Sequence, residues 1–498
     1  MNRIRNISAN IVVNLLLQLT TILCGLVLPR LIIASYGSEI NGMLSSITQF
    51  LGYITLLEAG MGSVVKASLY KPLANKDSNL LSKIVKTTNS FFRKIAYIFI
   101  IYLLFLAVYY QKISHTNYDF LFTFSLVLIL GISIFVQYYF GITYQILLQA
   151  DQKIWLTSGL QVITLILNTV ISVIFIKLGY SIHFVKIISA SIFTIRPIVY
   201  NFYIKKKYDI DNNVDKDNEL ISQRWDGLGH HIAYFIHTNT DVVLLTLFCG
   251  VKEVSVYSVF FMVVNGVKSL VNSISNALEP FFGKLLVGTN KEKIEKVFNI
   301  YETLNILLIA IIFTSTASLI QPFISVYTLG INDANYYRPL FAILITAAEG
   351  TYSLRSPYST VIFASGHFKQ TRNGAFIEAF VNIIISLLLI KPLGLIGVAI
   401  GTLFSMVLRS FQYILYLKYN ILNRRLSISI KKLIIMIVSV ILSFKFAFLV
   451  SDFSTNYIQW LILALKRTGI IIFINLFVFE IFYHRDMMDA INFIKERS

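Results

Sequence analysis

The first 29 residues, "MNRIRNISANIVVNLLLQLTTILCGLVLP", decide the class of fold. A basic start is followed by an apolar run from about Ile7 to Pro29. As a helix, this run is long enough to cross a hydrocarbon core of about 30 Å. It is too long for the apolar region of a cleaved signal peptide, and no small-residue cleavage pattern follows it. The run is therefore predicted to be the first membrane span.

The same character continues through the chain of 498 residues. Hydrophobic residues make up 56% of it and charged residues only 14%, with a mean hydropathy of +0.71. An average soluble domain carries roughly a quarter charged residues. We therefore predict an all-α polytopic membrane protein. Polar breaks separate about fourteen spans, near residues 7–29, 40–68, 95–111, 120–147, 157–176, 182–203, 227–249, 254–282, 300–321, 339–364, 375–391, 393–417, 433–451 and 457–482.

The distribution of Lys and Arg predicts the orientation of these spans. With the N-terminus placed inside, the inner segments carry 28 of the 43 Lys and Arg residues, and the outer loops carry six. Cytoplasmic loops of membrane proteins are enriched in these residues. Both termini are therefore expected in the cytoplasm.

The net charge of +18 does not predict a nucleic-acid partner, because the basic residues are spread over many short inner loops. Anionic lipid headgroups are the simpler expectation. Cys24 and Cys249 show no ligand spacing, so no metal site is expected. No nucleotide-binding or hydrolase motif is present in the sequence, which favours a transporter over an enzyme.

A polar segment divides the chain. The predicted organisation is an N-lobe of six spans (1–203), a cytoplasmic linker (204–226), a C-lobe of six spans (227–432) and an extra helix pair with a tail (433–498). The hairpins "ASYGSEINGMLSS" and "LFCGVKEVSVYSV" both place a glycine and then an acidic residue before a long helix. Two parallel lobes with the substrate path between them are a transporter architecture.

Two spans carry polar stripes. At about 100° per residue, a continuous helix over 40–68 would align small and polar residues on one face that ends at Lys66, with Glu58 at its edge. The span 254–282 repeats the pattern. Charged residues in a span usually face a bundle interior or a water-filled cavity. The stripes suggest one hydrated cavity, although polar contacts between packed helices would explain them too. The second stripe comprises Asn265, Lys268, Asn272, Asn276 and Glu279.

Two further places carry ionisable residues inside spans. His237 and Asp241 lie one turn apart in the seventh span, where such groups can relay protons or bind a cation. Arg355 lies two residues before Pro357, which is expected to break its helix. Arg355 is therefore a further candidate for the cavity.

Two stretches of the sequence resemble a known family. "LPRLIIASYGSEINGMLSSITQFLGYITLLEAGMG" (28–62) with "LYKPLA" (69–74) resembles the first hairpin of Wzx-type polysaccharide repeat-unit flippases of the multidrug/oligosaccharidyl-lipid/polysaccharide (MOP) exporter superfamily. "ASGHFKQTRNGAFIEAFVNIIISLLLIKPLGLIGVAIGTLFS" (364–405) resembles the family's later helices. The resemblance covers essentially the whole chain.

The resemblance implies a V-shaped pair of six-helix lobes that alternate access, in the bacterial cytoplasmic membrane. Its cargo would be an undecaprenyl-pyrophosphate-linked oligosaccharide, and the polymerase and initiating glycosyltransferases of the pathway could be further partners. A pyrophosphate crossing the membrane needs compensating positive charge. The substrate-binding candidates are Arg30, Lys66, Lys268 and Arg355 for the pyrophosphate, and Asn265, Asn272, Asn276 and Glu279 along the cavity stripe.

The related lipid II flippases, which this chain also resembles, bind sodium between their seventh, eleventh and twelfth helices. The matching positions here are Asp241, then Glu378 and Asn382 at offset four, and Thr402. The acid and the amide come in the opposite order from that family. The coupling candidates are these four residues with His237 and Glu58; no cofactor is expected beyond possible Na⁺ or H⁺ coupling.

Three functions stay open. The first is a lipid-linked oligosaccharide flippase. The second is a cation-coupled multidrug antiporter of the same superfamily, which would need an acidic and aromatic cavity. The third is a membrane enzyme of the same polysaccharide pathway, whose active site would be expected on a large outer loop, whereas the outer loops here are short.

Overall fold

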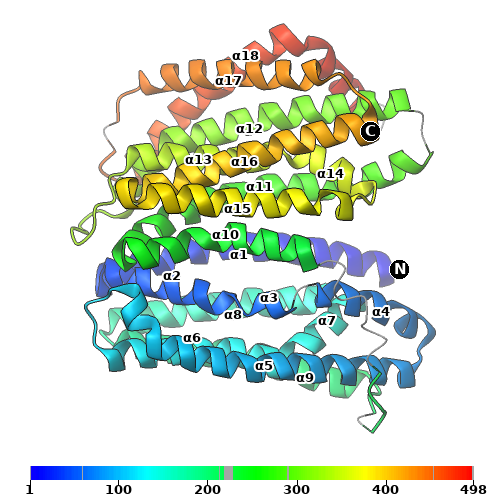
Figure 1. Cartoon of the computed structure of the whole chain (residues 1–498), viewed down its shortest axis with the longest axis vertical. Helices are drawn as coiled ribbons and strands as arrows, with labels where there is room; N and C mark the ends of the chain where they lie inside the picture. The colour runs from blue at the N-terminus through cyan, green and yellow to red at the C-terminus, as the bar shows by residue number, and fades with distance from the viewer. Residues whose placement is uncertain are drawn as a thin grey trace. The chain divides into compact units, whose positions relative to one another are not determined.

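The structure is a computed structural model, and it describes residues 2–58, 60–211, 213–217, 228–288, 291–452 and 454–495. Within these ranges the chain is helical and contains no strand. Figure 1 shows long helices lying side by side within each part of the chain. This confirms the predicted all-α fold class.

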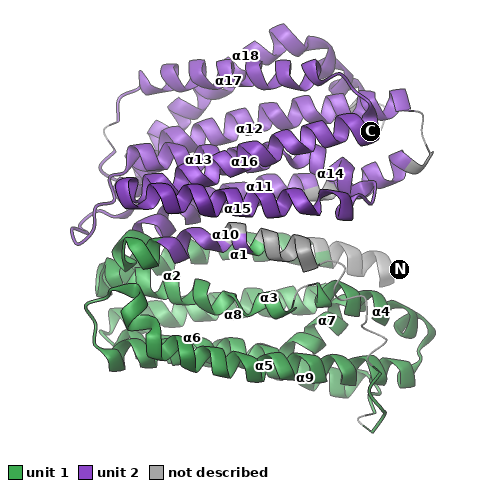
Figure 2. Cartoon of the chain, in the orientation of Figure 1, with its two compact units in different colours: residues 1–235, 245–255 green, residues 236–244, 256–498 purple. Residues whose placement is uncertain are grey.

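The chain divides into two compact units (Figure 2). Unit 1 comprises Met1–Phe235 and Leu245–Ser255, and unit 2 comprises Ile236–Leu244 and Val256–Ser498. The helix α10 (Leu228–Phe248) contributes to both. The predicted domain limits were drawn from loops in the sequence, and they remain a prediction. The two compact units divide the chain at other places, within α10 and within the helix that follows it.

Unit 1 is built mainly from the first half of the chain. Its helices are α1 (Asn2–Tyr36), α2 (Ser38–Gly52), α3 (Thr55–Glu58), α4 (Met61–Asn75), α5 (Ser78–Ser114), α6 (Phe120–Val136), the π-helical η1 (Gln137–Gly141), α7 (Ile142–Ala150), α8 (Ile154–Lys177) and α9 (Ile182–Lys207).

Unit 2 takes most of α11 (Val251–Gly288) and the helices after it. These are α12 (Lys291–Tyr327), α13 (Pro339–Leu354), α14 (Ser356–Ala364), α15 (Phe368–Leu393), α16 (Leu395–Leu417), the π-helical η3 (Lys418–Leu422), α17 (Leu426–Phe448) and α18 (Tyr457–Lys495).

The chain is a multi-pass membrane protein. Eleven helices of the described residues are long and apolar enough to cross a membrane. Each of the fourteen predicted spans falls on a helix or on a group of consecutive helices. The break at Pro357 is confirmed, because α13 ends at Leu354 and α14 begins at Ser356.

The predicted continuous helix over 40–68 is wrong. The segment is three helices, interrupted at Tyr53 and Ile54 and again before Met61. Gly60 has a φ of 76°, a left-handed conformation that favours glycine. Because the helical register is lost at both breaks, the small and polar residues of the predicted face that ends at Lys66 do not form one stripe.

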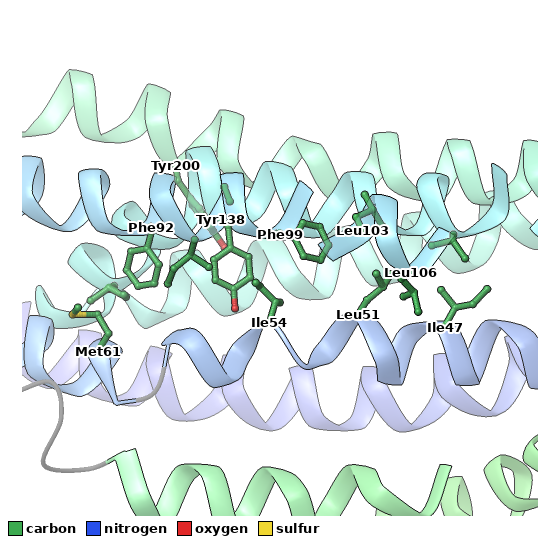
Figure 3. Close-up of a cluster of buried hydrophobic side chains, with 14 of the residues drawn as sticks. Ile47, Leu51, Ile54, Met61, Phe92, Phe99, Leu103, Leu106, Tyr138 and Tyr200 are labelled. Carbon is green, nitrogen blue, oxygen red and sulfur yellow. The ribbon is translucent and has the colours of Figure 1, made fainter. Parts of the chain in front are cut away.

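Buried apolar side chains of α2 to α7 hold unit 1 together around these breaks. Figure 3 shows Ile47, Leu51 and Ile54 directed toward side chains of α5, among them Phe99 and Leu103. In a membrane the outward-facing residues are apolar too, so close packing distinguishes the core from the lipid face. A Cβ at Gly131 of α6 would lie 2.5 Å from a Leu103 methyl carbon, which shows how tightly α5 and α6 pack.

The two hairpins singled out in the sequence share a backbone turn. Gly37 before α2 has a φ of 89°, and Gly250 before α11 has a φ of 84°. Both φ values are positive, and glycine adopts such values without strain. Within unit 1, a Cβ at Gly42 would lie 1.7 Å from the Val251 carbonyl oxygen, so only glycine lets these two backbones meet.

Candidate functional site

Lys268 of the predicted stripe has a partner inside unit 2. Its Nζ lies 2.8 Å from Glu349 Oε2 on α13, and both side chains are buried. A charge taken out of water is tolerated when it is paired in this way. Three other residues of the stripe on α11 are more accessible than Lys268. Asn265 is exposed, and Asn272 and Glu279 are half-buried.

Glu349 is the residue that the sequence analysis missed. It lies in "AILITAAEGTYSL", where it is the only acidic residue of an otherwise apolar and small-residue helix. An isolated acid in such a span is a signal for a buried partner. The ring of Tyr352, one turn further, faces both cations: its centroid lies 4.8 Å from Lys268 Nζ and 3.9 Å from the Arg355 guanidinium carbon.

Arg355 forms a second buried pair. It lies at the break between α13 and α14, and its NH1 donates to Glu378 Oε1 at 2.6 Å. The other oxygen of Glu378 lies 3.7 Å from Nε of Arg409 on α16. Arg409 also donates to the Thr371 carbonyl at 3.0 Å and to the Tyr413 hydroxyl at 2.8 Å. Glu378 thus faces two arginines, although it was predicted as a ligand for a cation.

Three of the other predicted coupling residues meet one turn away from Glu378. Thr402 Oγ1 donates to Asp241 Oδ2 at 2.9 Å, and Asn382 Nδ2 donates to Thr402 Oγ1 at 3.1 Å. Tyr257 OH also donates to Asp241 Oδ2, at 3.0 Å. The structure therefore brings together Asp241, Asn382 and Thr402 from α10, α15 and α16, all of them buried.

Several buried oxygens of this cluster have unused lone pairs. Asp241 Oδ1, Asn382 Oδ1 and Ser386 Oγ make no hydrogen bond within the part of the chain that the structure describes. Ser386 lies one helical turn from Asn382 on α15. Carboxylate, amide and hydroxyl oxygens are hard ligands that suit an alkali cation, and the carboxylate can equally accept a proton.

Glycines explain how these side chains come so close. A Cβ at Gly401 would lie 2.3 Å from Ser386 Oγ and 2.9 Å from the Ser386 nitrogen. A Cβ at Gly397 would lie 2.3 Å from the Leu389 carbonyl oxygen. The run "GLIGVAIGT" (394–402) thus lets the backbones of α15 and α16 touch, as small residues do between membrane helices. This contact places Thr402 beside Asn382.

In unit 1 the two ionisable residues of the second predicted span behave differently. Glu58 on α3 accepts a hydrogen bond from Tyr138 OH at 2.6 Å. Lys66 on α4 is half-buried and has no hydrogen-bond or ion-pair partner among the residues that the structure describes. Arg30 is half-buried on α1. The side chains of Asn276 and His237 lie outside the described residues.

A third buried network ties α14, α17 and the segment just before α17 to α12. Glu302 is fully buried, and its Oε2 lies 2.7 Å from Arg424 and 3.0 Å from Lys432. Its Oε1 accepts from Tyr358 OH at 2.6 Å and from Ser429 at 2.7 Å. The sequence analysis had assigned Arg424 and Lys432 to an inner loop, so this network was not expected.

The described residues hold no group of three or more His, Cys, Asp or Glu side chains placed to bind a metal ion. The cluster around Asp241 offers one carboxylate, together with amide and hydroxyl oxygens. The candidate site is therefore a cluster of buried oxygen atoms next to two buried acid–base pairs.

The comparisons with known proteins concern the fold. No protein-family model matches the chain, and no curated protein does. Among solved structures, the lipid II flippase MurJ in an inward closed conformation matches with a TM-score of 0.69 and 16% identity, covering 96% of this chain and 100% of that one. An inward-facing multidrug resistance MATE family transporter of the MOP superfamily matches with a TM-score of 0.61 and 14% identity, over 83% and 96%.

A MOP superfamily transporter from Pyrococcus furiosus, described as having a binding pocket of reverse polarity, matches with a TM-score of 0.59 and 14% identity, over 84% of this chain and 96% of that one. At these identities the likeness shows the fold and not the substrate. The chain therefore has the helical fold found in lipid II flippases and MATE transporters of the MOP superfamily.

Proposed function

We propose that the chain is a flippase for undecaprenyl-pyrophosphate-linked oligosaccharide repeat units. It would carry them by alternating access across the bacterial cytoplasmic membrane for assembly of a surface polysaccharide, with both termini in the cytoplasm. Fold likeness to a lipid II flippase over nearly the whole of both chains supports a transporter rather than an enzyme. The predicted substrate-binding candidates remain part of this proposal.

The surroundings of Lys66 are the main support for the flippase proposal. Taking an ammonium group out of water is costly, and most so at the centre of a span, where insertion scales give about 2.5–3.5 kcal/mol. Lys268 and Arg355 offset that cost with Glu349 and Glu378, but Lys66 has no such acid among the described residues. A pyrophosphate would supply the missing negative charge.

We also propose that a small cation, Na⁺ or H⁺, couples transport. Asp241 Oδ1 and Asn382 Oδ1 are buried oxygens with unused lone pairs, and the Thr402 hydroxyl links their side chains. These three residues would hold the ion, whose charge Asp241 balances. Glu378 would serve less well, because Arg355 and Arg409 already occupy its oxygens.

Other partners belong to the same proposal. Anionic lipid headgroups would meet the basic inner loops. The polymerase and the initiating glycosyltransferases of the pathway would be protein partners through the shared lipid-linked intermediate.

The test is a flipping assay in proteoliposomes with a fluorescent short-chain polyprenyl-pyrophosphate oligosaccharide. Quenching by an external reductant would report the fraction in the outer leaflet. Lys66→Ala is expected to lower the rate by about tenfold or more, since one charge-assisted contact to phosphate is lost. Lys66→Arg should keep most of the rate.

Lys71→Ala is the matched control, because Lys71 is an exposed lysine on the same helix. It should flip at the wild-type rate. If Lys66→Ala also flips at the wild-type rate, the role of Lys66 is rejected.

A cation-coupled multidrug antiporter is the second candidate. The MATE transporter fold and the Asp241 cluster favour it. In that case hydrophobic organic cations should raise the melting temperature of the purified protein and the polyprenyl-pyrophosphate lipid should not. That result would replace the flippase proposal.

A further inference from the structure

The segment between α12 and α13 forms a small polar cavity that plays no part in the site described above. It is a shallow hollow of about 480 Å³ that is widely open to the surroundings. Small-molecule sites commonly have volumes of about 300–1,000 Å³. Its polar lining comes from the last turns of α12 and from the loop that follows: Ser325, Thr328, Asn332, Asp333, Asn335 and Tyr337.

Gln321, a buried residue of α12, holds this loop in place. Its side-chain oxygen accepts from the Arg338 backbone N–H at 2.8 Å, and its amide nitrogen donates to the Tyr336 carbonyl at 3.3 Å. Within the loop, the Tyr337 N–H donates to Asn335 Oδ1 at 2.9 Å. Such contacts fix the backbone before any ligand arrives, which reduces the entropy cost of binding.

The cavity lies next to a group of aromatic residues typical of a membrane surface. The ring of Phe323 lies 5.1 Å from that of Trp460 and 5.6 Å from that of Tyr327. Tyr457, at the start of α18, is half exposed and also contacts Phe323. Trp and Tyr gather where spans leave the hydrocarbon core. The loop that follows Tyr327 is therefore in the aqueous phase.

The lining selects one class of ligand. Amide, carboxylate and hydroxyl groups dominate it, and the exposed ring of Tyr337 offers a flat apolar face. Sugars present hydroxyl groups around flat patches of C–H bonds, which match these groups. A lipid tail would leave the polar groups unpaired. A phosphate or uronic acid would meet the Asp333 carboxylate of this lining.

We propose that this cavity is a docking site for neutral or amino-sugar oligosaccharides. Tyr337 stacks on a sugar ring, and Asn332 and Asp333 bind its hydroxyl groups. The site lies on the outer face of the membrane, an assignment that rests on the orientation in the proposed function. A flippase with this site holds the glycan part of its cargo at the face where it is released.

The experiment uses the full chain in detergent and lipid-free glycans, so that the flipping reaction is not required. Fluorescently labelled protein is applied to an array of soluble bacterial oligosaccharides that includes neutral, amino-sugar and uronic-acid members. The affinity for the strongest binder is then measured by calorimetry. Wild type is expected to bind neutral or amino-sugar members in preference to uronic acids.

Tyr337→Ala and Asn332→Ala should each weaken binding by about tenfold, as the loss of one anchoring contact does. Both side chains are exposed, so the melting temperature should not change. Leu329→Ala is the control: Leu329 is an exposed residue of the same loop that does not line the cavity, and its removal should leave the affinity unchanged.

Three outcomes would overturn the proposal. In the first, wild type binds no glycan on the array. In the second, the Tyr337→Ala variant binds glycans as well as wild type does. In the third, the hollow binds Ca²⁺ alone, and Asp333→Asn abolishes that binding. A protein that flips its lipid-linked cargo but binds no free glycan refutes only the docking site. A protein that binds glycans here but fails to flip refutes only the proposed function.

Discussion

Lys66 in unit 1 and Lys268 in unit 2 look alike in the sequence, yet the structure gives them different surroundings. Lys268 is buried against Glu349 at 2.8 Å, whereas Lys66 is half-buried with no partner among the described residues. A lysine in a span is thus not by itself a sign of a substrate site. The presence or absence of a nearby carboxylate separates a structural charge from one available to a ligand.

The comparison extends to the arginines. Arg355 and Arg409 share Glu378, and Arg424 shares Glu302 with Lys432. Unit 2 therefore binds most of its buried cations with its own acids. Substitution of these acids should affect folding, and substitution of Lys66 should affect transport.

The largest effect is expected for Glu302→Ala. It leaves Arg424 and Lys432 buried without their main partner, which should lower the free energy of unfolding by about 3–5 kcal/mol. Reversible SDS titration in mixed micelles measures this quantity. Glu295→Ala is the control, because Glu295 is partly exposed and lies 3.9 Å from Arg424, so the loss should stay below about 1 kcal/mol. Equal losses for both variants would contradict the interpretation.

The pair Lys268–Glu349 should give the next largest effect. Glu349→Leu alone should cost about 2–4 kcal/mol, because the ammonium stays buried, although the ring of Tyr352 still faces it. The double variant Lys268→Met with Glu349→Leu should recover most of that loss. The double-mutant cycle in the same micelles measures the coupling. Additive losses would show that the two side chains act independently.

Gly401→Ala should have an intermediate effect. The added Cβ would overlap Ser386 Oγ and approach the Ser386 backbone, so α15 and α16 must separate at a cost of about 1–3 kcal/mol. Gly159→Ala in α8 is the control, because its Cβ would lie 4.0 Å from the nearest Val13 carbon, an ordinary contact. A Gly401→Ala protein as stable as Gly159→Ala would refute close packing at this point.

The smallest effect on stability is expected for Lys66→Met. With no partner to lose, the free energy of unfolding should change by less than about 0.5 kcal/mol, as for most substitutions away from special features. Lys71→Met on the same helix provides the reference value. A large loss for Lys66→Met alone would place Lys66 with Lys268 as a structural residue and remove the contrast between the two.

Much of the fold could be predicted from hydropathy, because each span must satisfy its own backbone hydrogen bonds as a helix. The break at Pro357 was predictable for the same reason, since proline lacks an N–H. The break at Gly60 was not, because a glycine within a span is common and only the backbone shows its positive φ.

The site was harder to predict than the fold. Glu378 and Asn382 lie one turn apart on α15, so their shared helix face was visible in the sequence. Their partners were not, since Arg355 and Thr402 come from different helices. Glu349 pairs with a residue far away in the chain, and no helical period encodes such a contact. Periodicity places residues on a face, whereas tertiary packing chooses which of them meet.

The glycine contacts between α15 and α16 have a practical consequence for spectroscopy. Two helices whose backbones touch at Gly397 and Gly401 cannot slide or separate without breaking the contact, so they must travel as one rigid element. Spin labels placed on their exposed residues Leu388 and Phe404 should keep a constant separation through the transport cycle. That separation would serve as a reference distance with which distance changes elsewhere in the protein can be compared.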